Sequence, residues 1–235
     1  MGALSSIAAL TGAGISAESG IATFRGAGGL WENHSIEEVA TPQGFARDPL
    51  LVWRFYDARR RQGSTCKPNK GHLALARLER ELKGRFTLIT QNVDGLHAMA
   101  GSRRILELHG SLWRVRCTRC GFASEDRRVP LPELPPRCAC GALLRPDIVW
   151  FGEPLDEAIL GKAWQAAQSC ELFLVVGTSG VVEPAASLAR IASSNGAEVW
   201  EVNPEETPLT PICARSFRSS AGAVMDQVVD ELLGR

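Results

Sequence analysis

Short apolar runs recur along the chain and alternate with longer segments in which apolar residues return every three or four positions. The runs occupy residues 7–10, 86–90, 105–108, 171–176 and 197–202, and we expect a last short strand at 213–217. Apolar runs of this length between turn residues are typical of buried parallel strands. The run at 171–176 is the most hydrophobic, so we expect it near the centre of the sheet.

The segments between these runs carry helix signals, at residues 49–62, 70–82, 155–169, 185–195 and 221–233. Asp48 followed by Pro49 is a helix start, and Asn69 caps the next helix. On the helix at 70–82 we expect His72 to be packed and hydrogen-bonded, and the buried side to carry Leu73, Leu75, Leu78 and Leu82. Strands that alternate with helices predict an α/β fold with a doubly wound, mostly parallel sheet. Residues 26–44 show no clear period, so we expect a long loop there, of the kind that often covers a ligand.

Glycines follow the first apolar run directly, at Gly12 and Gly14, and a third comes at Gly20. Glycine lets the chain turn sharply and lets backbone N–H groups approach a phosphate, and the positive end of a following helix favours the anion. The spacing departs from the dinucleotide fingerprint, whose third glycine comes three residues after the second. The glycines alone leave a phosphate cradle and a structural turn open; the residues at 23–25, which are polar, aromatic and cationic, favour the cradle.

Small or polar residues follow four of the predicted strands, at residues 12–16, 91–94, 177–179 and 203–205. The carboxyl ends of parallel strands share one edge, where open α/β sheets bind ligands. The sequence therefore predicts that an extended, phosphate-bearing ligand lies across this edge. His109 follows the run at 105–108 and is a candidate general base, because the histidine pKa of about 6.5 suits proton transfer near neutral pH.

Four of the seven cysteines form two close pairs, Cys117 with Cys120 and Cys138 with Cys140, on either side of a proline-rich stretch. This spacing predicts a tetrahedral, structural zinc site, because four thiolates leave no open position for catalysis. A reduced or disulfide-paired ribbon without metal is the alternative. We expect residues 147–153 to form an apolar strand that leads out of this module.

The length and charge of the chain limit the classes of protein to which it can belong. The 235 residues suffice for one large domain with a small insertion. Lys+Arg and Asp+Glu both number 26, which argues against a strongly electrostatic nucleic-acid binder. No apolar run is long enough to span a bilayer, and the N-terminus shows no secretion signal. We expect a cytoplasmic protein, because the cysteines do not form a disulfide framework.

Taken together and in this order, the motifs resemble the sirtuins, which are NAD-dependent protein lysine deacylases. The resemblance covers nearly the whole chain and rests on the four cysteines and residues 12–16, 23–25, 91–94, 109–110, 177–179 and 203–204. It implies a Rossmann-like NAD domain at residues 1–112 and 146–235, a helical module at about 26–70, and an inserted zinc ribbon at 113–145. It also implies that an acyl-lysine peptide binds between the domains as an added strand. No membrane or specific nucleic-acid partner is expected, and the oligomeric state stays open, with a monomer allowed.

The resemblance assigns roles residue by residue. The pyrophosphate and nicotinamide-ribose contacts are Gly12, Ala13, Gly14, Ser16, Ser19, Thr23, Phe24, Arg25 and Trp31. The nicotinamide contacts are Gln91, Asn92, Val93, Asp94 and His109. The adenosine contacts are Gly177, Thr178, Ser179, Asn203, Pro204, Glu205 and Ala221. The peptide contacts are Val149, Phe151, Gly152, Glu153 and Val181. His109, Asn92 and Asp94 are the implied catalytic residues, with His109 taking a proton from the ribose hydroxyls after the acyl oxygen has displaced nicotinamide.

Tyr56 and Arg59 lie three apart on the predicted helix at 49–62 and therefore share a face. Without further information, the helical pattern indicates that Tyr56 and Arg59 belong to a solvated, basic helix end. They resemble the Tyr-x-x-Arg pair of class III sirtuins, which prefer succinyl- and malonyl-lysine, and Ala27 matches the small residue beside the acyl pocket of those enzymes. The resemblance thus implies removal of succinyl, malonyl and also acetyl groups, with release of nicotinamide and 2′-O-acyl-ADP-ribose. A mainly deacetylating enzyme is the alternative within the family.

Two other classes of protein remain as alternatives. A hydride-transfer dehydrogenase also binds NAD on a doubly wound sheet, but the glycine spacing disfavours it. A zinc-ribbon adaptor that senses NAD without turnover is disfavoured by the combination of His109 with Asn92 and Asp94. ADP-ribosyl transfer stays open as a side activity.

Overall fold

The structure is a computed structural model, and it describes residues 6–22, 30–31 and 34–235. A six-stranded sheet forms its centre, in the order β11-β10-β9-β1-β4-β5. The strands are β1 (Ile7–Thr11), β4 (Phe86–Thr90), β5 (Ile105–Glu107), β9 (Leu172–Val176), β10 (Glu198–Val202) and β11 (Arg215–Phe217). Every pairing between them is parallel. The predicted α/β fold and the inner position of residues 171–176 are confirmed, since β9 lies between β1 and β10.

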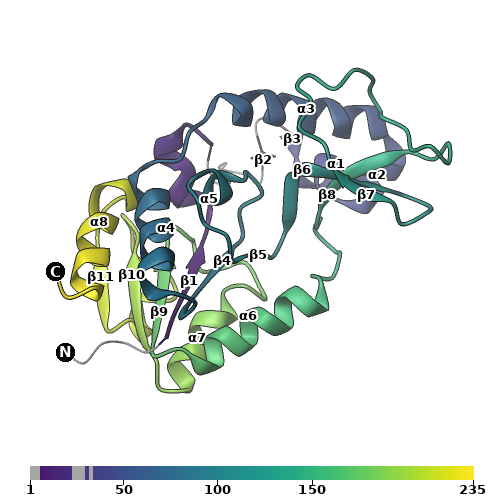
Figure 1. The fold of residues 1–235 in the computed structure, drawn as a ribbon. Coiled ribbons are helices and arrows are strands. Elements are labelled where there is room, and N and C mark those ends of the chain that lie inside the picture. Colours follow the sequence, from purple (N-terminus) through teal and green to yellow (C-terminus); the bar gives the residue numbers. More distant parts are fainter. Residues whose placement is uncertain (1–5, 23–29, 32–33) are drawn as a thin grey trace.

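Helices cover both faces of this sheet (Figure 1). On one face, α4 (Lys70–Leu82) and α8 (Ala221–Leu232) pack against alternate residues of β1 and β9, such as Ala9 and Leu174. On the other face, α6 (Glu157–Ser169) and α7 (Ser187–Ser194) pack against the intervening residues, such as Leu10 and Phe173. Both faces of the central strands are therefore buried, which explains their continuous apolar runs.

A second, smaller core lies at the other end of the molecule (Figure 1). It joins helices α1 (Ile36–Val39), α2 (Pro42–Arg47) and α3 (Pro49–Thr65) to an antiparallel sheet in the order β7-β6-β8. These strands are β6 (Gly110–Cys117), β7 (Ala123–Glu125) and β8 (Leu144–Ile148). Asp48 caps α3 through Leu51 N at 2.9 Å, and Asn69 caps α4 through Gly71 N at 2.9 Å, as the sequence predicted. The division of the chain into domains at residues 112–113 and 145–146 stays a prediction.

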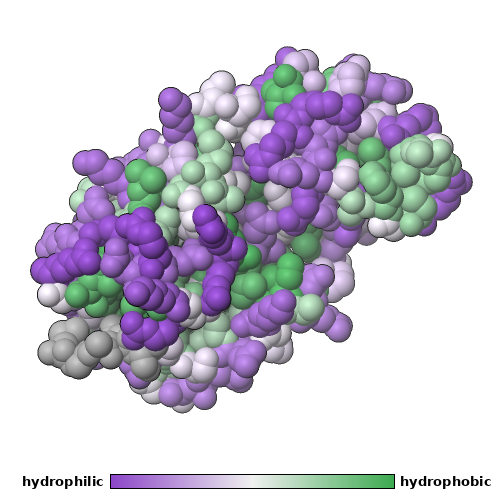
Figure 2. Space-filling view, in the orientation of Figure 1, coloured by the Kyte–Doolittle hydropathy of each residue, from purple (hydrophilic) through white to green (hydrophobic). Residues whose placement is uncertain are grey.

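Short elements complete the fold. They are the 3-10 helices η1 (Ala13–Ser19) and η2 (Thr210–Ile212), the pair β2 (Leu30–Trp31) and β3 (His34–Ser35), and α5 (Leu96–Met99). The surface face in Figure 2 is largely hydrophilic, with apolar residues in separate patches. Within the described part of the chain, no helix is long and apolar enough to cross a membrane.

The structure corrects three expectations from the sequence. Residues 36–39 and 42–47 are helical rather than loop, because Ser35 and Glu38 form a capping box and Thr41 caps Pro42–Arg47. Leu73 is 51% exposed, and Ala74 takes its place on the buried side of α4. The strand expected at 147–153 is instead β8, which ends at Ile148. Beyond it the backbone leaves the sheet, since Phe151 N donates to Ala40 O and Gly152 has a φ of 87°.

Candidate active site

The glycine loop after β1 packs directly on the loop after β9. Gly14 N donates to Gly177 O at 2.7 Å, and Gly12 N donates to Val176 O at 3.1 Å. A Cβ on Gly12 would lie 2.8 Å from Thr178 Cα, and one on Gly14 would lie 2.7 Å from Gly177 O. The glycines are therefore needed for this close approach of two backbones. The loop continues into η1, a 3-10 helix, where the sequence suggested an ordinary helix.

Ser16, on η1, contacts two side chains from the end of β4 and one from helix α4. Its hydroxyl donates to Asp94 Oδ2 at 2.7 Å and accepts from Asn92 Nδ2 at 3.2 Å. It also lies 3.3 Å from His72 Nε2. Asn69 N donates to His72 Nδ1, so Nε2 carries the ring proton and donates to Ser16. The prediction that His72 is packed and hydrogen-bonded is confirmed, because it is fully buried and its pKa is lowered by burial to about 4.

The residues at 91–94 face the glycine loop. Asn92 Nδ2 donates to Gly12 O at 3.0 Å, and Gln91 Nε2 donates to Thr178 Oγ1 at 2.9 Å. Asp94 is buried, and this burial raises the pKa of its carboxyl group. The hydrogen bonds that the carboxylate accepts from Leu96 N and Ser16 lower the pKa and so offset part of the rise. The structure thus brings the predicted loops after β1, β4 and β9 into direct contact at one edge.

His109 lies just past β5 with its ring half-buried. Its Nδ1 is 3.0 Å from Gln91 O, and a carbonyl can only accept, so Nδ1 carries the proton. This arrangement leaves Nε2 as the basic atom. Burial lowers the pKa of His109 below its ordinary value, and the bond to Gln91 opposes the shift. His109 is therefore neutral and able to accept a proton at neutral pH.

The loop after β10 is held against the loop after β9. Asn203 Nδ2 donates to Thr178 O at 2.8 Å. Arg218 donates to Glu205 O at 3.1 Å and pairs with the fully buried Glu201 at 2.7 Å. Ala221, the first residue of α8, is also buried. Of the other residues predicted here, Ser179 is partly buried, and Pro204 and Glu205 are exposed.

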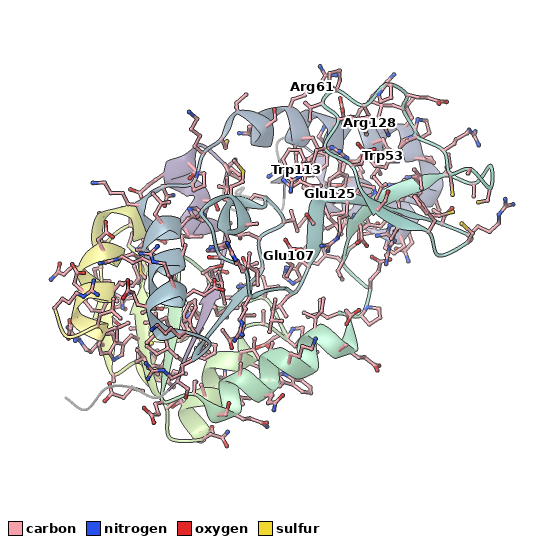
Figure 3. The ribbon with its side chains drawn as sticks, in the orientation of Figure 1. Trp53, Arg61, Glu107, Trp113, Glu125 and Arg128 are labelled. Atoms are coloured by element: carbon pink, nitrogen blue, oxygen red, sulfur yellow. The ribbon has the colours of Figure 1, made fainter. Side chains whose placement is uncertain are left out.

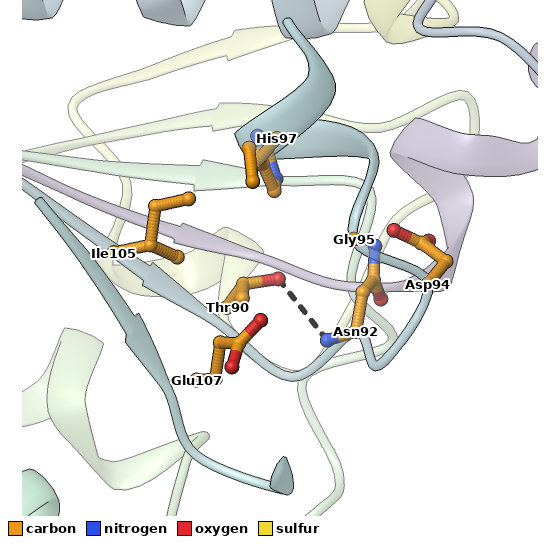
Figure 4. Close-up of a pocket in the computed structure, with 8 residues that line it drawn as sticks. Thr90, Asn92, Asp94, Gly95, His97, Ile105 and Glu107 are labelled. Atoms are coloured by element: carbon orange, nitrogen blue, oxygen red, sulfur yellow. Dashed lines mark hydrogen bonds between the residues drawn. The ribbon is translucent and has the colours of Figure 1, made fainter. Parts of the chain in front are cut away.

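A cavity of about 10 Å³ lies beneath the 91–94 segment (Figure 4). Asn92, Asp94, His97 and Glu107 contribute polar groups to its wall. The cavity has about the volume of a single water molecule, so it does not hold the extended ligand that the strand ends predict. His97 Nε2 lies 2.9 Å from Thr11 Oγ1, and burial lowers the pKa of His97 to about 3.

Tyr56 and Arg59 are buried on α3, at 1% and 8% exposure, so the interpretation as a solvated helix end is wrong for both. Trp150 Nε1 donates to the Tyr56 hydroxyl at 2.9 Å. Burial raises the pKa of Tyr56 and of Asp94, and in both cases the nearby charge of Arg59 opposes the rise. Arg59 is therefore close enough to act on both the phenol and the Asp94 carboxylate.

The predicted peptide contacts lie on two segments of the chain, at residues 149–153 and at Val181. Phe151 and Val181 are exposed large hydrophobic residues, at 47% and 63%. Glu153 is held by Arg145 at 2.6 Å and accepts from Trp150 N at 2.9 Å. Val149 N donates to His109 O at 3.0 Å, which ties this segment to the candidate base. Thr23, Phe24, Arg25 and Ala27 lie outside the described residues, as does the side chain of Trp31.

The four cysteines form one cluster in which all sulfur atoms lie within 4.8 Å of one another. Cys117 Sγ is 3.6 Å from Cys140 Sγ, and Cys120 Sγ is 3.7 Å from Cys138 Sγ. Four sulfurs at zinc–thiolate bond length form a tetrahedron with edges of about 3.8 Å. The cluster therefore fits a tetrahedral structural zinc ion, and Arg119 N and Cys120 N donate to the Cys117 sulfur.

The geometry is that of an α/β protein with small, polar loops at one edge of a parallel sheet, a half-buried histidine beside them and a four-cysteine cluster that fits a metal ion. The model of the Sir2 family matches residues 12–184. The NAD-dependent protein deacylase of Aquifex aeolicus is 52% identical over 227 residues, which are 96% of this chain and 95% of the relative. An NAD-dependent protein deacylase of Thermus thermophilus is 53% identical over 222 residues, 92% of this chain and 85% of the relative.

Solved structures agree with this assignment. A Sir2 homologue in complex with NAD is 50% identical, with a TM-score of 0.90, over 97% of this chain and 89% of the other. Sir2Af2 bound to a myristoylated histone peptide is 37% identical, with a TM-score of 0.76, over 96% and 90%. The chain belongs to the Sir2 family.

Trp113 was not singled out by the sequence, yet it contacts the predicted nicotinamide segment. Its Nε1 donates to Asp94 O at 2.7 Å. It lies within β6, four residues beyond His109. A tryptophan in a strand has no local pattern that indicates such a contact, and only its short distance in sequence from His109 could have drawn attention to it.

Proposed function

We propose that this chain, an NAD-dependent protein deacylase of the Sir2 family, preferentially removes succinyl and malonyl groups from lysine side chains and removes acetyl groups less well. The reaction releases nicotinamide and 2′-O-acyl-ADP-ribose. The burial of Tyr56 and Arg59 on one face of α3, close to Asp94, carries this proposal. A desolvated guanidinium inside a substrate channel favours an acyl group that ends in a carboxylate.

Tyr56 supports the same preference. Trp150 donates to the Tyr56 oxygen, so the phenol is the acceptor in this contact. Burial keeps the pKa of Tyr56 above its ordinary value, and the phenol stays protonated at neutral pH. Tyr56 and Arg59 together can offer three hydrogen-bond donors to one carboxylate: two from the guanidinium and one from the phenol.

The remaining residues take the roles that the family resemblance assigns. NAD supplies a ribose carbon with nicotinamide as its leaving group and a ribose hydroxyl that accepts the acyl group. We assign Gly12, Gly14 and Ser16 to the pyrophosphate side, and Asn92 and Asp94 to nicotinamide and its ribose. We assign the loops after β9 and β10 to adenosine, because Asn203 Nδ2 bonds one loop to the other. His109 Nε2 accepts a proton from the ribose hydroxyls.

The acylated peptide enters as an added strand between residues 149–153 and Val181. The support for this is exposure: Phe151 and Val181 present large apolar side chains to solvent. Peptide binding in general is supported by complexes of Sir2 homologues, one with a myristoylated histone peptide and one with a deacetylated p53 peptide. The zinc held by Cys117, Cys120, Cys138 and Cys140 is structural, because four thiolates fill its coordination sphere.

The test is the variant Arg59→Met, measured with one peptide that carries either succinyl- or acetyl-lysine. Loss of a desolvated charge pair costs roughly 2–5 kcal/mol, which is on the order of 30-fold to several-thousand-fold. We expect kcat/KM for the succinyl peptide to fall by this factor, mainly through KM, and that for the acetyl peptide to stay within a few-fold.

Arg54→Met is the matched control, because Arg54 lies on the same helix and is exposed. It should change neither activity. Equal losses on both peptides in Arg59→Met would contradict the acyl preference and leave Arg59 with a structural role in a deacetylase.

A further inference from the structure

Strand β6 connects the candidate base to the metal site. It begins at Gly110, directly after His109, and ends at the zinc ligand Cys117. Two of its residues bind the segment that carries Asp94: Leu112 N donates to Val93 O at 2.8 Å, and Trp113 Nε1 donates to Asp94 O at 2.7 Å. The predicted nicotinamide segment is therefore fastened to the small sheet as well as to the glycine loop.

The indole of Trp113 is fixed from several sides. It is 5% exposed, and the guanidinium carbons of Arg60 and Arg127 each lie 5.7 Å from its ring centroid. A Cβ on Gly63 of α3 would lie 3.3 Å from Trp113 Cζ2. In Figure 3 Trp113 lies below helix α3. The ring thus has little freedom to move away from Asp94.

The turn that follows Asp94 is shaped around this indole. Gly95 has a φ of 78°, and a Cβ there would lie 2.9 Å from Trp113 Cδ1. Only glycine combines this backbone conformation with such close contact. The Asp94 peptide group is consequently held by Trp113 at its carbonyl, while Ser16 and Leu96 N hold its carboxylate at 2.7 Å and 2.8 Å.

We propose that Trp113 is a positioning residue, which holds Asp94 in the position that binds nicotinamide. The zinc-bearing sheet, through Trp113, then sets the affinity of the enzyme for nicotinamide. This inference rests on the assignment of Asp94 to nicotinamide under the proposed function. Loss of the indole N–H leaves a buried carbonyl without its donor, and the Asp94 peptide plane turns to find another. The carboxylate, two bonds from the Cα, moves with it.

The experiment compares wild-type enzyme with Trp113→Phe, Trp53→Phe and Asp94→Asn. Trp53→Phe is the matched control, because Trp53 is fully buried in the same core and its Nε1 donates to a main-chain carbonyl, Leu144 O, at 2.8 Å. Both Phe variants lose one indole donor and part of a ring, so their melting temperatures should fall by similar amounts. The specific readout is the concentration of nicotinamide that halves deacylation at fixed NAD and peptide.

We expect Trp113→Phe to shift this concentration about tenfold, in the same direction as Asp94→Asn, and Trp53→Phe to leave it unchanged. If Trp113→Phe does not fold, 3-benzothienylalanine at position 113 keeps the bicyclic ring and removes only the N–H donor. An effect of Asp94→Asn without one of Trp113→Phe, or equal effects of both Phe variants, would overturn the proposal for Trp113. No effect of Asp94→Asn would instead overturn the assignment of Asp94, and the proposal with it.

Discussion

Gly14→Ala is the substitution whose effect follows most directly from the geometry. The added Cβ would lie 2.7 Å from Gly177 O and 2.8 Å from Gly177 Cα, where ordinary contacts begin at about 3.4 Å. Gly177 is restrained, because its N–H donates to Val202 O at 2.9 Å. The atoms that must shift therefore belong to the backbone at the ends of β1 and β9, rather than to a flexible side chain.

Forcing a methyl group into a packed site costs about 1–3 kcal/mol. For a chain of 235 residues this corresponds to a melting temperature lower by about 2–12 °C. The same strain separates the two loops that we assign to NAD, and 1–3 kcal/mol of lost binding raises KM for NAD by about 5- to 150-fold. Thermal unfolding with and without NAD, together with steady-state kinetics, measures both effects.

Gly161→Ala is the matched control, because Gly161 lies within α6 and a Cβ there meets no atom within 4 Å. Alanine is the better helix former by about 1 kcal/mol, so this variant should be as stable as the parent or more stable, with unchanged KM. If Gly14→Ala kept both the melting temperature and the NAD KM of the parent, the close packing of these loops would be refuted.

Three further predictions concern the base and the metal. His109→Ala should lower kcat by roughly 10²–10⁴-fold, with a melting temperature close to that of the parent; near-parental turnover would remove His109 from the base role. Because burial lowers the pKa of His109, the acid limb of kcat/KM should lie below pH 6.5, and activity should be lost as the pH falls through the folded-state pKa; a limb above pH 6.5 would contradict this sign. Metal analysis should find about one zinc per chain, and Cys138→Ser should lower the melting temperature, whereas a zinc-free preparation with unchanged melting and full activity would refute a structural metal.

The sequence predicts the central sheet well, because its signals are local. Strands such as residues 172–176 are buried on both faces and read as continuous apolar runs, and helices such as α3 and α4 begin at recognisable caps, Asp48 and Asn69. The shared edge follows from topology, since all the large-sheet pairings are parallel. A shared edge at the carboxyl ends of parallel strands predicts contacts between the loops there. Asn92 contacts Gly12, and Gln91 contacts Thr178, as predicted.

Long-range contacts of single side chains could not be predicted in this way. The burial of Arg59 depends on elements distant in sequence, and the pattern of α3 alone favoured a solvated basic end. The bond from Trp113 to Asp94 spans 19 residues and has no local signature. The helices α1 and α2 did carry capping signals, but they are too short to show an apolar period.

The most direct test of the central claim is product analysis of the wild-type enzyme by liquid chromatography and mass spectrometry. One peptide carrying acetyl-, malonyl- or succinyl-lysine is incubated with NAD, and the nucleotide and peptide products are quantified together. The account predicts free nicotinamide and 2′-O-acyl-ADP-ribose in equal amounts with deacylated peptide, fastest for the succinyl and malonyl forms. Formation of NADH, or no consumption of NAD with any of the three peptides, would contradict it.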